Sequence, residues 1–270
     1  MLPRFLGEID ADAGSARLDA DEARHLSQVL RLGAGDEVAV FDGAGREFRA
    51  RVERVSRDRA DLALVEASVA APESAVRLTL AQAALKGDKM DEVIRDATMM
   101  GVAAIEPLVT AHTAAHLKPG SAPERWRRVA VASSKQCRRA VVPSIGSGLT
   151  FNDWIARDVA EVKLILVEPS AVDPSAAAAE TAGRDMHAAE SAGRVAQAGA
   201  RPVVPVLEKR RQTPSSATLL VGPEGGWSAE EIERALGAGY RPLTLGRRTL
   251  RADVVPVIAI GVLQYLWGDL

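Results

Sequence analysis

The pattern of apolar and polar residues changes character near residue 75. Before this position the apolar residues fall in short strand-like runs, as where Phe48, Ala50 and Val52 alternate with charged residues. One stretch with helical spacing interrupts these runs, and Asp19 or Asp21 is placed to cap its first turn. Short antiparallel strands around a single helix favour a small β-barrel. The expected elements are a helix over residues 21–30 and strands over residues 37–41, 47–55 and 61–67.

Beyond residue 76, strand-like and helix-like segments alternate, which is typical of an α/β domain with a parallel sheet. Ser228 and Glu231 have the spacing of a capping box, and they predict the start of one of the helices. The expected strands cover residues 78–84, 103–109, 163–167, 218–221 and 242–245, and the expected helices cover residues 89–100, 124–139, 152–159, 229–236 and 255–267.

The change of pattern predicts two domains, residues 1–72 and residues 73–270, joined through the Ala-, Ser- and Pro-rich residues 68–75. Within the second domain, residues 173–200 are rich in Ala and Gly and suggest a helical or partly mobile insertion. The chain has 270 residues, of which 47% are hydrophobic, so it can bury a sizeable core. This composition excludes a disordered protein.

Charge is nearly balanced, because 34 Lys and Arg face 36 Asp and Glu and give a formal net charge of −2. Proteins that coat nucleic acid through bulk charge carry a large Lys and Arg excess, so this class is excluded. RNA binding would have to use local patches. The clearest patch lies within residues 118–139, where seven Lys and Arg accompany Trp126 and the single acid Glu124. It suits either a phosphate-contacting face or an ordinary solvated helix face.

Metal-binding and membrane signals are weak. Cys137 is the only cysteine, so neither an intramolecular disulfide nor a cysteine zinc cluster can form, and a reducing compartment suits the chain. His112 and His116 could share a helix face, but no carboxylate–histidine motif accompanies them, so we expect no metal site. The longest apolar stretch, residues 254–263, is too short to span a bilayer, and the first residues lack a signal-peptide pattern. We expect a cytoplasmic protein.

The most informative stretch is residues 219–228, Leu-Leu-Val-Gly-Pro-Glu-Gly-Gly-Trp-Ser, where a buried strand runs into a glycine-rich turn and a capped helix. Gly222, Gly225 and Gly226 permit backbone angles that other residues avoid, and they let a ligand approach the main chain closely. A tight strand-to-helix turn without a ligand explains the glycines equally well. The stretch has neither the Gly-Lys-Ser/Thr ending of a phosphate loop nor the dinucleotide spacing.

A second strand ends at Gly246 and is followed by Arg247, Arg248 and Arg251. In an open α/β sheet the carboxyl ends of the strands form the ligand crevice, so the glycine turn and these guanidinium groups are expected to converge. Arginine in such a place suits an anionic oxygen. The other interpretation is a solvated surface cluster of arginines.

Together these features resemble the RsmE-type uracil-N3-methyltransferases of 16S ribosomal RNA, the RNA of the small subunit, which are a branch of the SPOUT superfamily. The resemblance covers almost the whole chain, and the order of the glycine-turn and Leu-Arg motifs near its carboxyl end is the specific part. The matching motifs are Pro3-Arg4-Phe5, His25 with residues 29–31, Asp42-Gly43, residues 86–90, Gly101, residues 105–107, Gln136, Cys137, Arg139, Pro143, residues 220–226, Leu245-Gly246, Leu250-Arg251 and residues 268–270.

The resemblance implies an amino-terminal PUA-like barrel that binds RNA over residues 1–72, and an α/β SPOUT domain with a trefoil knot over residues 73–270. It also implies a homodimer that binds S-adenosylmethionine in the knot and small-subunit ribosomal RNA or the assembled subunit as substrate, with no metal and no membrane. The implied cofactor contacts are Leu166, Val167, Glu168, Leu220, Val221, Gly222, Pro223, Gly225, Gly226, Leu245, Gly246 and Leu250. The implied RNA contacts are Arg4, Arg31, Lys86, Arg139, Arg247 and Arg248.

The reaction itself sets the demands on the catalytic side chains. Uracil N3 carries a proton and becomes nucleophilic when that proton leaves, whereas a sulfonium methyl group is already activated. Arg251 is expected to stabilise the uracil anion at its carbonyl oxygens. Glu224 or Asp253 is a candidate for removing the proton. Both carboxylates also suit structural roles, because Asp253 could cap the last helix before Pro256 and Glu224 could shape the turn.

The chain departs from the family pattern near the expected active site. Asp96, Met99 and His112 replace residues of other types, and residues 253–256, Asp-Val-Val-Pro, replace a stretch that carries hydroxyl groups. An RNA-binding relative that assists ribosome assembly without methyl transfer is therefore the alternative function.

Overall fold

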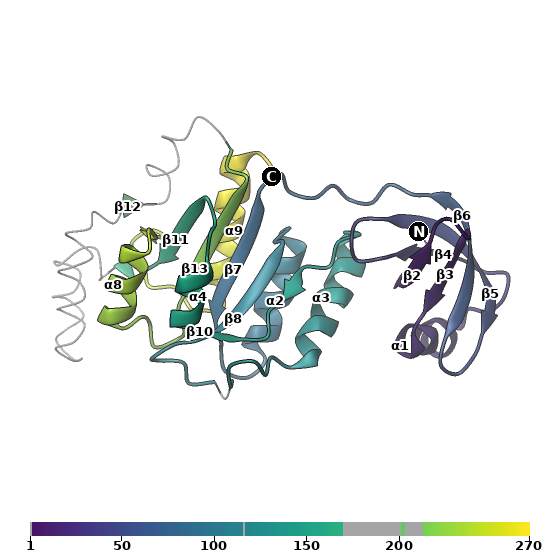
Figure 1. Cartoon of the computed structure of the whole chain (residues 1–270), viewed down its shortest axis with the longest axis horizontal. Coiled ribbons are helices and arrows are strands. Elements are labelled where there is room, and N and C mark those ends of the chain that lie inside the picture. The colour runs from purple at the N-terminus through teal and green to yellow at the C-terminus, as the bar shows by residue number, and fades with distance from the viewer. Residues whose placement is uncertain (1, 116, 170–200, 203–212) are drawn as a thin grey trace. The chain divides into compact units, whose positions relative to one another are not determined.

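The computed structural model describes residues 2–115, 117–169, 201–202 and 213–270 (Figure 1). The described chain forms two compact units. Unit 1 contains the residues up to Glu73 together with Arg128–Val142, and unit 2 contains Ser74–Arg127 and the residues from Pro143 onward. The predicted insertion over residues 173–200 lies outside the described residues.

Unit 1 is built on a six-stranded sheet whose strands are β1 (Arg4–Leu6), β2 (Glu8–Asp10), β3 (Ser15–Leu18), β4 (Glu37–Phe41), β5 (Glu47–Val55) and β6 (Ala60–Ala67). The order across the sheet is β1-β4-β5-β6-β3-β2, with β1 parallel to β4 and the other pairs antiparallel. The predicted small antiparallel β-domain is present as a curled sheet, and no pairing joins its end strands β1 and β2 in the described part of this unit. Strands β4 and β5 have the predicted bounds.

One face of this curled sheet is covered by α1 (Ala20–Arg24) and by η1 (His25–Val29), a single π-helical turn. The sequence predicted one continuous helix here, but the Leu30 N–H donates to the His25 carbonyl at 3.0 Å, five residues back, and this widens the turn. The expected cap at Asp19 is confirmed, since its carboxylate accepts from the Glu22 N–H at 2.9 Å.

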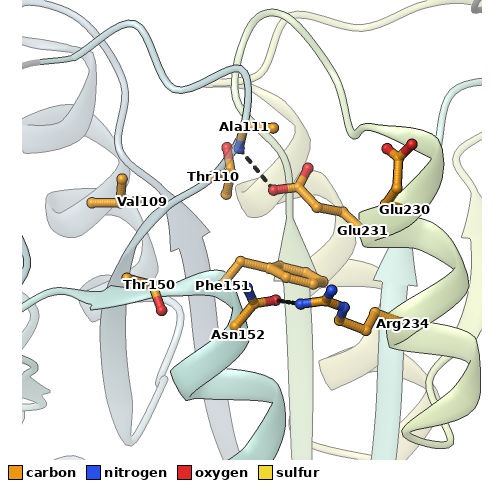
Figure 2. Close-up of a pocket in the computed structure, with 9 residues that line it drawn as sticks. All are labelled: Val109, Thr110, Ala111, Thr150, Phe151, Asn152, Glu230, Glu231 and Arg234. Carbon is orange, nitrogen blue, oxygen red and sulfur yellow. Dashed lines mark hydrogen bonds between the residues drawn. The ribbon is translucent and has the colours of Figure 1, made fainter.

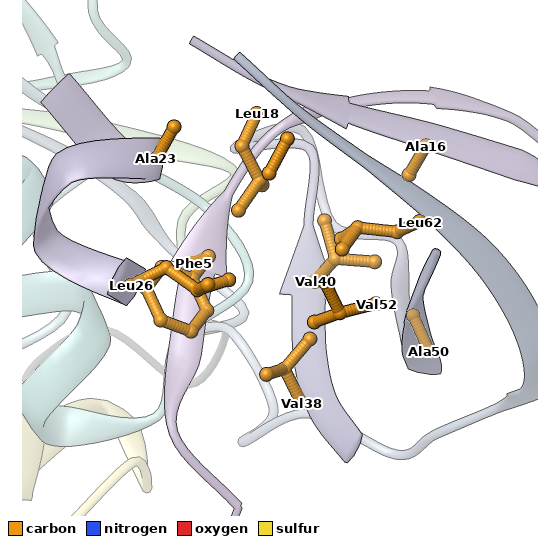
Figure 3. Close-up of a cluster of buried hydrophobic side chains, with 11 residues drawn as sticks. Phe5, Ala16, Leu18, Ala23, Leu26, Val38, Val40, Ala50, Val52 and Leu62 are labelled. Carbon is orange, nitrogen blue, oxygen red and sulfur yellow. The ribbon is translucent and has the colours of Figure 1, made fainter. Parts of the chain in front are cut away.

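The core of unit 1 lies between the helix and the inner face of the sheet (Figure 3). Leu26 of η1 and Phe5 of β1 are fully buried beside one another, and the alternation along β5 points Ala50 and Val52 into the same cluster. Burial of such side chains stabilises the fold by about 1.5–3 kcal/mol each for the larger ones. The other buried members are Ala16, Leu18, Ala23, Val38, Val40, Ala60 and Leu62.

Unit 2 is built on a parallel sheet of eight strands. These are β7 (Arg77–Ala83), β8 (Ala104–Val109), β9 (Ser144–Ile145), β10 (Leu149–Thr150), β11 (Val162–Leu166), β12 (Arg201–Pro202), β13 (Ser216–Val221) and β14 (Arg241–Thr244). The order is β10-β8-β7-β13-β11-β14-β12, and β9 also pairs with β8. The central strands are almost entirely apolar, because helices cover both faces of a parallel sheet (Figure 1).

The helices of the described chain beyond residue 74 are α2 (Lys89–Met99), α3 (Glu124–Cys137), α4 (Phe151–Arg157), α8 (Ala229–Gly237) and α9 (Val255–Trp267). Every predicted helix in this region is confirmed within two residues at each end. The predicted capping box of α8 is also present, because Ser228 Oγ accepts from the Glu231 N–H at 3.2 Å and Glu231 accepts from the Ser228 N–H at 3.0 Å.

A buried polar network ties α4 to the neighbouring strands of unit 2. The Tyr240 hydroxyl donates to Asp158 Oδ2 at 2.5 Å and accepts from Trp154 Nε1 at 2.9 Å, while Thr218 of β13 donates to Asp158 Oδ1 at 3.0 Å. Burial, followed by the hydrogen bond to the Asp158 carboxylate, raises the pKa of the Tyr240 phenol far above its usual range. The hydroxyl therefore stays protonated and keeps donating.

Candidate cofactor and RNA site

Three of the predicted cofactor segments begin where three adjacent parallel strands end. Strand β11 ends at Leu166, β13 ends at Val221 and β14 ends at Thr244, and β11 pairs with both of the others. The segments 166–168, 220–226 and 245–250 therefore start at one edge of the sheet. This is the edge at which α/β sheets bind ligands.

The glycine turn after β13 has steric reasons for its glycines. Gly226 closes the turn with its N–H donating to the Pro223 carbonyl at 3.0 Å, and its φ of +70° favours glycine. A Cβ on Gly225 would lie 3.0 Å from the His112 Cβ. A Cβ on Gly222 would lie 3.1 Å from the Trp227 indole. The turn is thus packed against side chains on one side and keeps its main chain bare.

Trp227 fastens this turn to the neighbouring strand. Its indole Nε1 donates to the Leu166 carbonyl at 2.9 Å, and its ring packs against Phe151 with centroids 5.6 Å apart. The ring nitrogen Nδ1 of His112 donates to the Gly225 carbonyl at 3.1 Å. The sequence pattern assigns no role to Trp227, and it marks His112 only as one of two histidines with helical spacing and as a departure from the family pattern. The position of Trp227 directly after the double glycine was the available signal.

Glu224, a candidate proton acceptor, lies in the same turn and is held by one cation and one main-chain amide. Its Oε1 pairs with Lys89 Nζ at 3.0 Å and accepts from the Lys86 N–H at 3.4 Å. Burial alone would raise the pKa of the Glu224 carboxyl, but these hydrogen bonds and the Lys89 charge outweigh it and hold the pKa below its usual range. Glu224 is therefore ionised but a weaker base than an ordinary glutamate.

Arg251 and Asp253 form a two-bonded ion pair after β14. Arg251 Nε donates to Asp253 Oδ1 at 3.1 Å and Nη2 donates to Oδ2 at 2.5 Å. The hydrogen bond from Arg251 is the main reason that the pKa of Asp253 lies below its usual range. Asp253 does not cap α9 as one interpretation expected, because Val254 is the capping residue and makes no side-chain hydrogen bond there.

Four of the six predicted RNA contacts have exposed side chains, namely Arg31, Lys86, Arg247 and Arg248. Arg4 and Arg139 are different, because both are buried within unit 1. Arg4 pairs with Glu47 and donates to the carbonyls of residues 134, 135 and 139, and Arg139 pairs with Glu73. These guanidinium groups hold the protein together and have little surface left for RNA.

The basic helix α3 is also largely neutralised within the protein. Arg125 pairs with Asp91 at 3.3 Å, Lys135 pairs with Glu22, and Trp126 is buried with 5% of its surface exposed. The cations of α3 therefore do not form a continuous phosphate-contacting face. Isolated exposed charges such as Arg128 remain on its surface.

A hollow of about 290 Å³ lies between α4, α8 and the end of β8 (Figure 2). The Glu231 carboxylate accepts a hydrogen bond from the Ala111 N–H at 2.8 Å, and Arg234 donates one to Asn152 (Figure 2). These polar groups satisfy one another, and none of the predicted cofactor or RNA residues lines this hollow. It does not belong to the candidate site.

Metal and membrane features are absent from the part of the chain that is described. No group of three or more His, Cys, Asp or Glu side chains there could hold a metal ion, and His116 lies outside that part. No helix among the described residues is long and apolar enough to cross a membrane.

Sequence profiles define the class of protein to which this fold and site belong. The profile described as RNA methyltransferase domain matches residues 72–264, and the profile described as RNA methyltransferase PUA domain matches residues 18–65. Unit 1 is accordingly a PUA-like curled sheet, and unit 2 is a parallel-sheet α/β methyltransferase domain of the SPOUT class.

Similar proteins show to which group of RNA methyltransferases the chain belongs. The ribosomal RNA small subunit methyltransferase E of Synechocystis sp. is 30% identical over 250 residues, which is 92% of this chain and 72% of the relative. The protein of the same name from Bacillus subtilis is 25% identical over 257 residues, 94% of this chain and 91% of the relative. The Neisseria gonorrhoeae ribosomal RNA small subunit methyltransferase E, solved with bound S-adenosyl methionine, has a TM-score of 0.78 and 25% identity and covers 99% of this chain and 98% of its own. The chain belongs to the RNA methyltransferase family, and within it to the ribosomal RNA small subunit methyltransferase E group.

Proposed function

We propose that this chain transfers the methyl group of S-adenosylmethionine to N3 of a specific uridine in small-subunit ribosomal RNA. The observation that carries the proposal is the convergence of the glycine turn after β13 and the Arg251-bearing loop after β14 at one edge of the sheet, in a chain of this family. Family membership supports the RNA substrate, and the site supports a reaction in which an anion develops beside a bound cofactor.

We also propose that the protein acts in the cytoplasm and that residues 1–72 and residues 73–270 are its two functional domains.

The residues at this edge fit the cofactor. Gly226 and Gly246 both adopt left-handed backbone angles, and no atom lies within 4 Å of the place that a Cβ on Gly246 would take. A Cβ on Gly226 would lie 3.6 Å from Glu168 Oε1, so a carboxylate lies beside the bare turn and suits a cationic sulfonium. When bound, S-adenosylmethionine supplies the activated methyl group. We propose that the main chain of residues 166–168, 220–226 and 245–250 holds it.

Chain topology supports the knotted arrangement that the resemblance implies. The chain passes from β13 to β14, which lie on opposite sides of β11, and then returns to α9. Helix α9 packs beside α2, where Gln264 Nε2 donates to the Met100 carbonyl at 3.0 Å. We propose that this return passes through the loop that precedes it and forms the trefoil knot around the cofactor.

In the proposed mechanism, Arg251 donates hydrogen bonds to the uracil carbonyl oxygens as negative charge develops on them. Asp253 holds the guanidinium by two bonds, so that its orientation is set before the RNA binds. Glu224 and Asp253 stay the candidate proton acceptors, although their lowered pKa values weaken them as bases. Positioning of N3 in line with the methyl group then carries much of the rate enhancement.

We also propose that the chain acts as a homodimer through α9. This helix carries no charged residue over its 13 positions, and it leaves Ile258 39% exposed and Tyr265 72% exposed. An apolar patch of this kind is covered by a second copy at low energetic cost. Sedimentation is expected to show a dimer for the unmodified chain and a monomer for Tyr265→Asp. A monomeric unmodified chain would contradict the proposal.

The proposed activity is tested by titrating the protein with S-adenosylmethionine in a calorimeter and then assaying methyl transfer to small subunits from cells that lack the enzyme. We expect saturable cofactor binding and transfer to those subunits, with no transfer to subunits that already carry the modification. Cofactor and subunit binding without transfer would favour the alternative function of an assembly factor. Absence of cofactor binding would reject both the enzyme and its proposed site.

A further inference from the structure

A second hollow, of about 390 Å³, lies at the carboxyl end of β7 within unit 2. The turn after β7 forms one side of it, and the segment that leads into α3 with the first turn of that helix forms the other. Its principal lining residues are Lys86, Gly87, Leu117, Pro123, Arg125 and Trp126.

The lining combines apolar surface with two exposed cations. Leu117, Pro123 and the Trp126 indole supply the apolar part. The Lys86 side chain is exposed and has no hydrogen-bond or ion-pair partner in the described part of the chain, whereas Arg125 shares its charge with Asp91 at 3.3 Å. Apolar walls beside exposed Lys and Arg suit a nucleotide, whose base is flat and apolar on its faces and whose phosphate is an anion.

The hollow adjoins the turn to which we assign methyl transfer. The Lys86 N–H donates to Glu224 Oε1 at 3.4 Å, and Lys89, three residues further on, pairs with the same oxygen at 3.0 Å. Gly87 has a φ of +62°, and no atom lies within 4 Å of the place that its Cβ would take, so the turn leaves the approach open. The hollow therefore lies next to the glycine turn, within reach of a nucleotide beside one bound there.

Trp126 adds an unmet hydrogen-bond donor to the wall. The side chain is 5% exposed, and its Nε1–H is buried without a partner among the described residues. A buried donor of this kind usually has an acceptor, and its absence costs about 1–3 kcal/mol. A nucleotide in the hollow would lie against the Trp126 side chain and change the surroundings of its indole N–H.

We propose that this hollow binds one nucleotide of the substrate RNA that neighbours the target uridine, with the base against the Trp126 wall and the phosphate at Lys86. The inference rests on the proposed function, because it places an RNA strand at the glycine turn. It makes the hollow a specificity site, since it selects which uridine arrives in line with the methyl group.

Direct binding is tested on the full chain with uridine 5′-monophosphate as the probe and the indole N–H signals of the tryptophans as the readout. Trp126→Phe assigns the Trp126 signal. We expect this signal to move on titration, while the signal of Trp154, whose N–H is bound to the Tyr240 hydroxyl at 2.9 Å, stays in place. A titration that leaves the Trp126 signal unmoved overturns the proposal whether or not the chain methylates RNA.

Kinetics supply the second test, with Lys86→Ala compared with Arg77→Ala. Arg77 is an exposed residue at the opposite end of the same strand β7, so the control removes an equal charge away from the hollow. We expect Lys86→Ala to raise the KM for small subunits about tenfold, to leave kcat within about twofold and to lower the salt slope of binding by about one. Equal KM values for the two variants overturn the proposal. Absence of methyl transfer by the unmodified chain instead rejects the proposed function. In that case the titration still shows whether the hollow binds a nucleotide.

Discussion

Arg251 is 71% exposed at its side chain, yet its partner Asp253 is only 6% exposed. A guanidinium anchored by a buried carboxylate keeps a fixed orientation while its remaining donors stay available to a ligand. We expect Arg251→Ala to leave the affinity for S-adenosylmethionine unchanged and to lower kcat by about a hundredfold or more, as the loss of an anion-stabilising donor does in other enzymes. Calorimetry and single-turnover transfer measure the two quantities. Arg77→Ala is the matched control, and turnover near that of the control would remove Arg251 from its role.

Glu106 offers a pH-dependent prediction. Burial raises the pKa of its carboxyl above the usual range, although the Gly148 N–H, which donates at 3.2 Å, and the Arg157 charge act in the opposite direction. Because the folded chain then holds its proton to higher pH than the unfolded chain, this group's contribution makes the free energy of unfolding fall as pH rises through the folded pKa. We therefore expect the free energy of unfolding of Glu106→Gln, relative to that of the unmodified chain, to increase as the pH rises from about 4 to about 7. Urea denaturation at both pH values checks this, and a difference independent of pH would contradict it.

At the residue scale, the sequence identifies charged groups but not the partners that burial gives them. The sequence marks Arg4 and Arg139 as cations but cannot show that Glu47 and Glu73, 43 and 66 residues away respectively, meet them inside unit 1. The same limit applies to Arg251 and Asp253, whose pairing turned an expected helix cap into an anchor for the guanidinium. Charge and spacing identify candidate groups, whereas the partner of each group depends on the tertiary fold.

Elements were predictable where their pattern was long. Helix α9 has the predicted bounds, because a continuous apolar run is enclosed by Pro256 at its start and by Gly268, with a φ of +83°, at its end. Strand β14 was predicted despite its four residues, whereas the two- and three-residue strands β1, β9 and β10 were missed, since so few positions show no periodicity. The π-helical turn η1 was also missed, because its residues have the same spacing of apolar positions as an α-helix.

The network around Asp158 gives a stability prediction at this scale, because it joins α4, β13 and the start of β14. Tyr240→Phe removes one hydroxyl and leaves both the Asp158 carboxylate and the Trp154 N–H short of a partner. We expect the free energy of unfolding to fall by about 1–3 kcal/mol. Val69→Ala is the control, since that side chain is 92% exposed, and should change stability by less than about 0.5 kcal/mol. Equal effects of the two substitutions would show that the network contributes nothing.

At the scale of the whole molecule, the small net charge of −2 is an average over local differences. Many cations pair inside the protein, as Arg4, Lys135 and Arg139 do, and few such as Lys86, Arg247 and Arg248 are exposed near the proposed site. Binding through a few exposed charges selects particular RNA surfaces, whereas a strongly basic surface would bind RNA indiscriminately. This charge distribution therefore suits recognition of a particular RNA surface.

The most direct test of this account is to map the product. Small subunits from cells that lack the enzyme are incubated with the protein and isotopically labelled S-adenosylmethionine, and the ribosomal RNA is digested and analysed by mass spectrometry. The account predicts a single labelled nucleotide, a uridine that carries the methyl group on N3, and labelling that is slower by about a hundredfold or more with Arg251→Ala. Label on another base or another atom, or no label despite saturating cofactor, would contradict it.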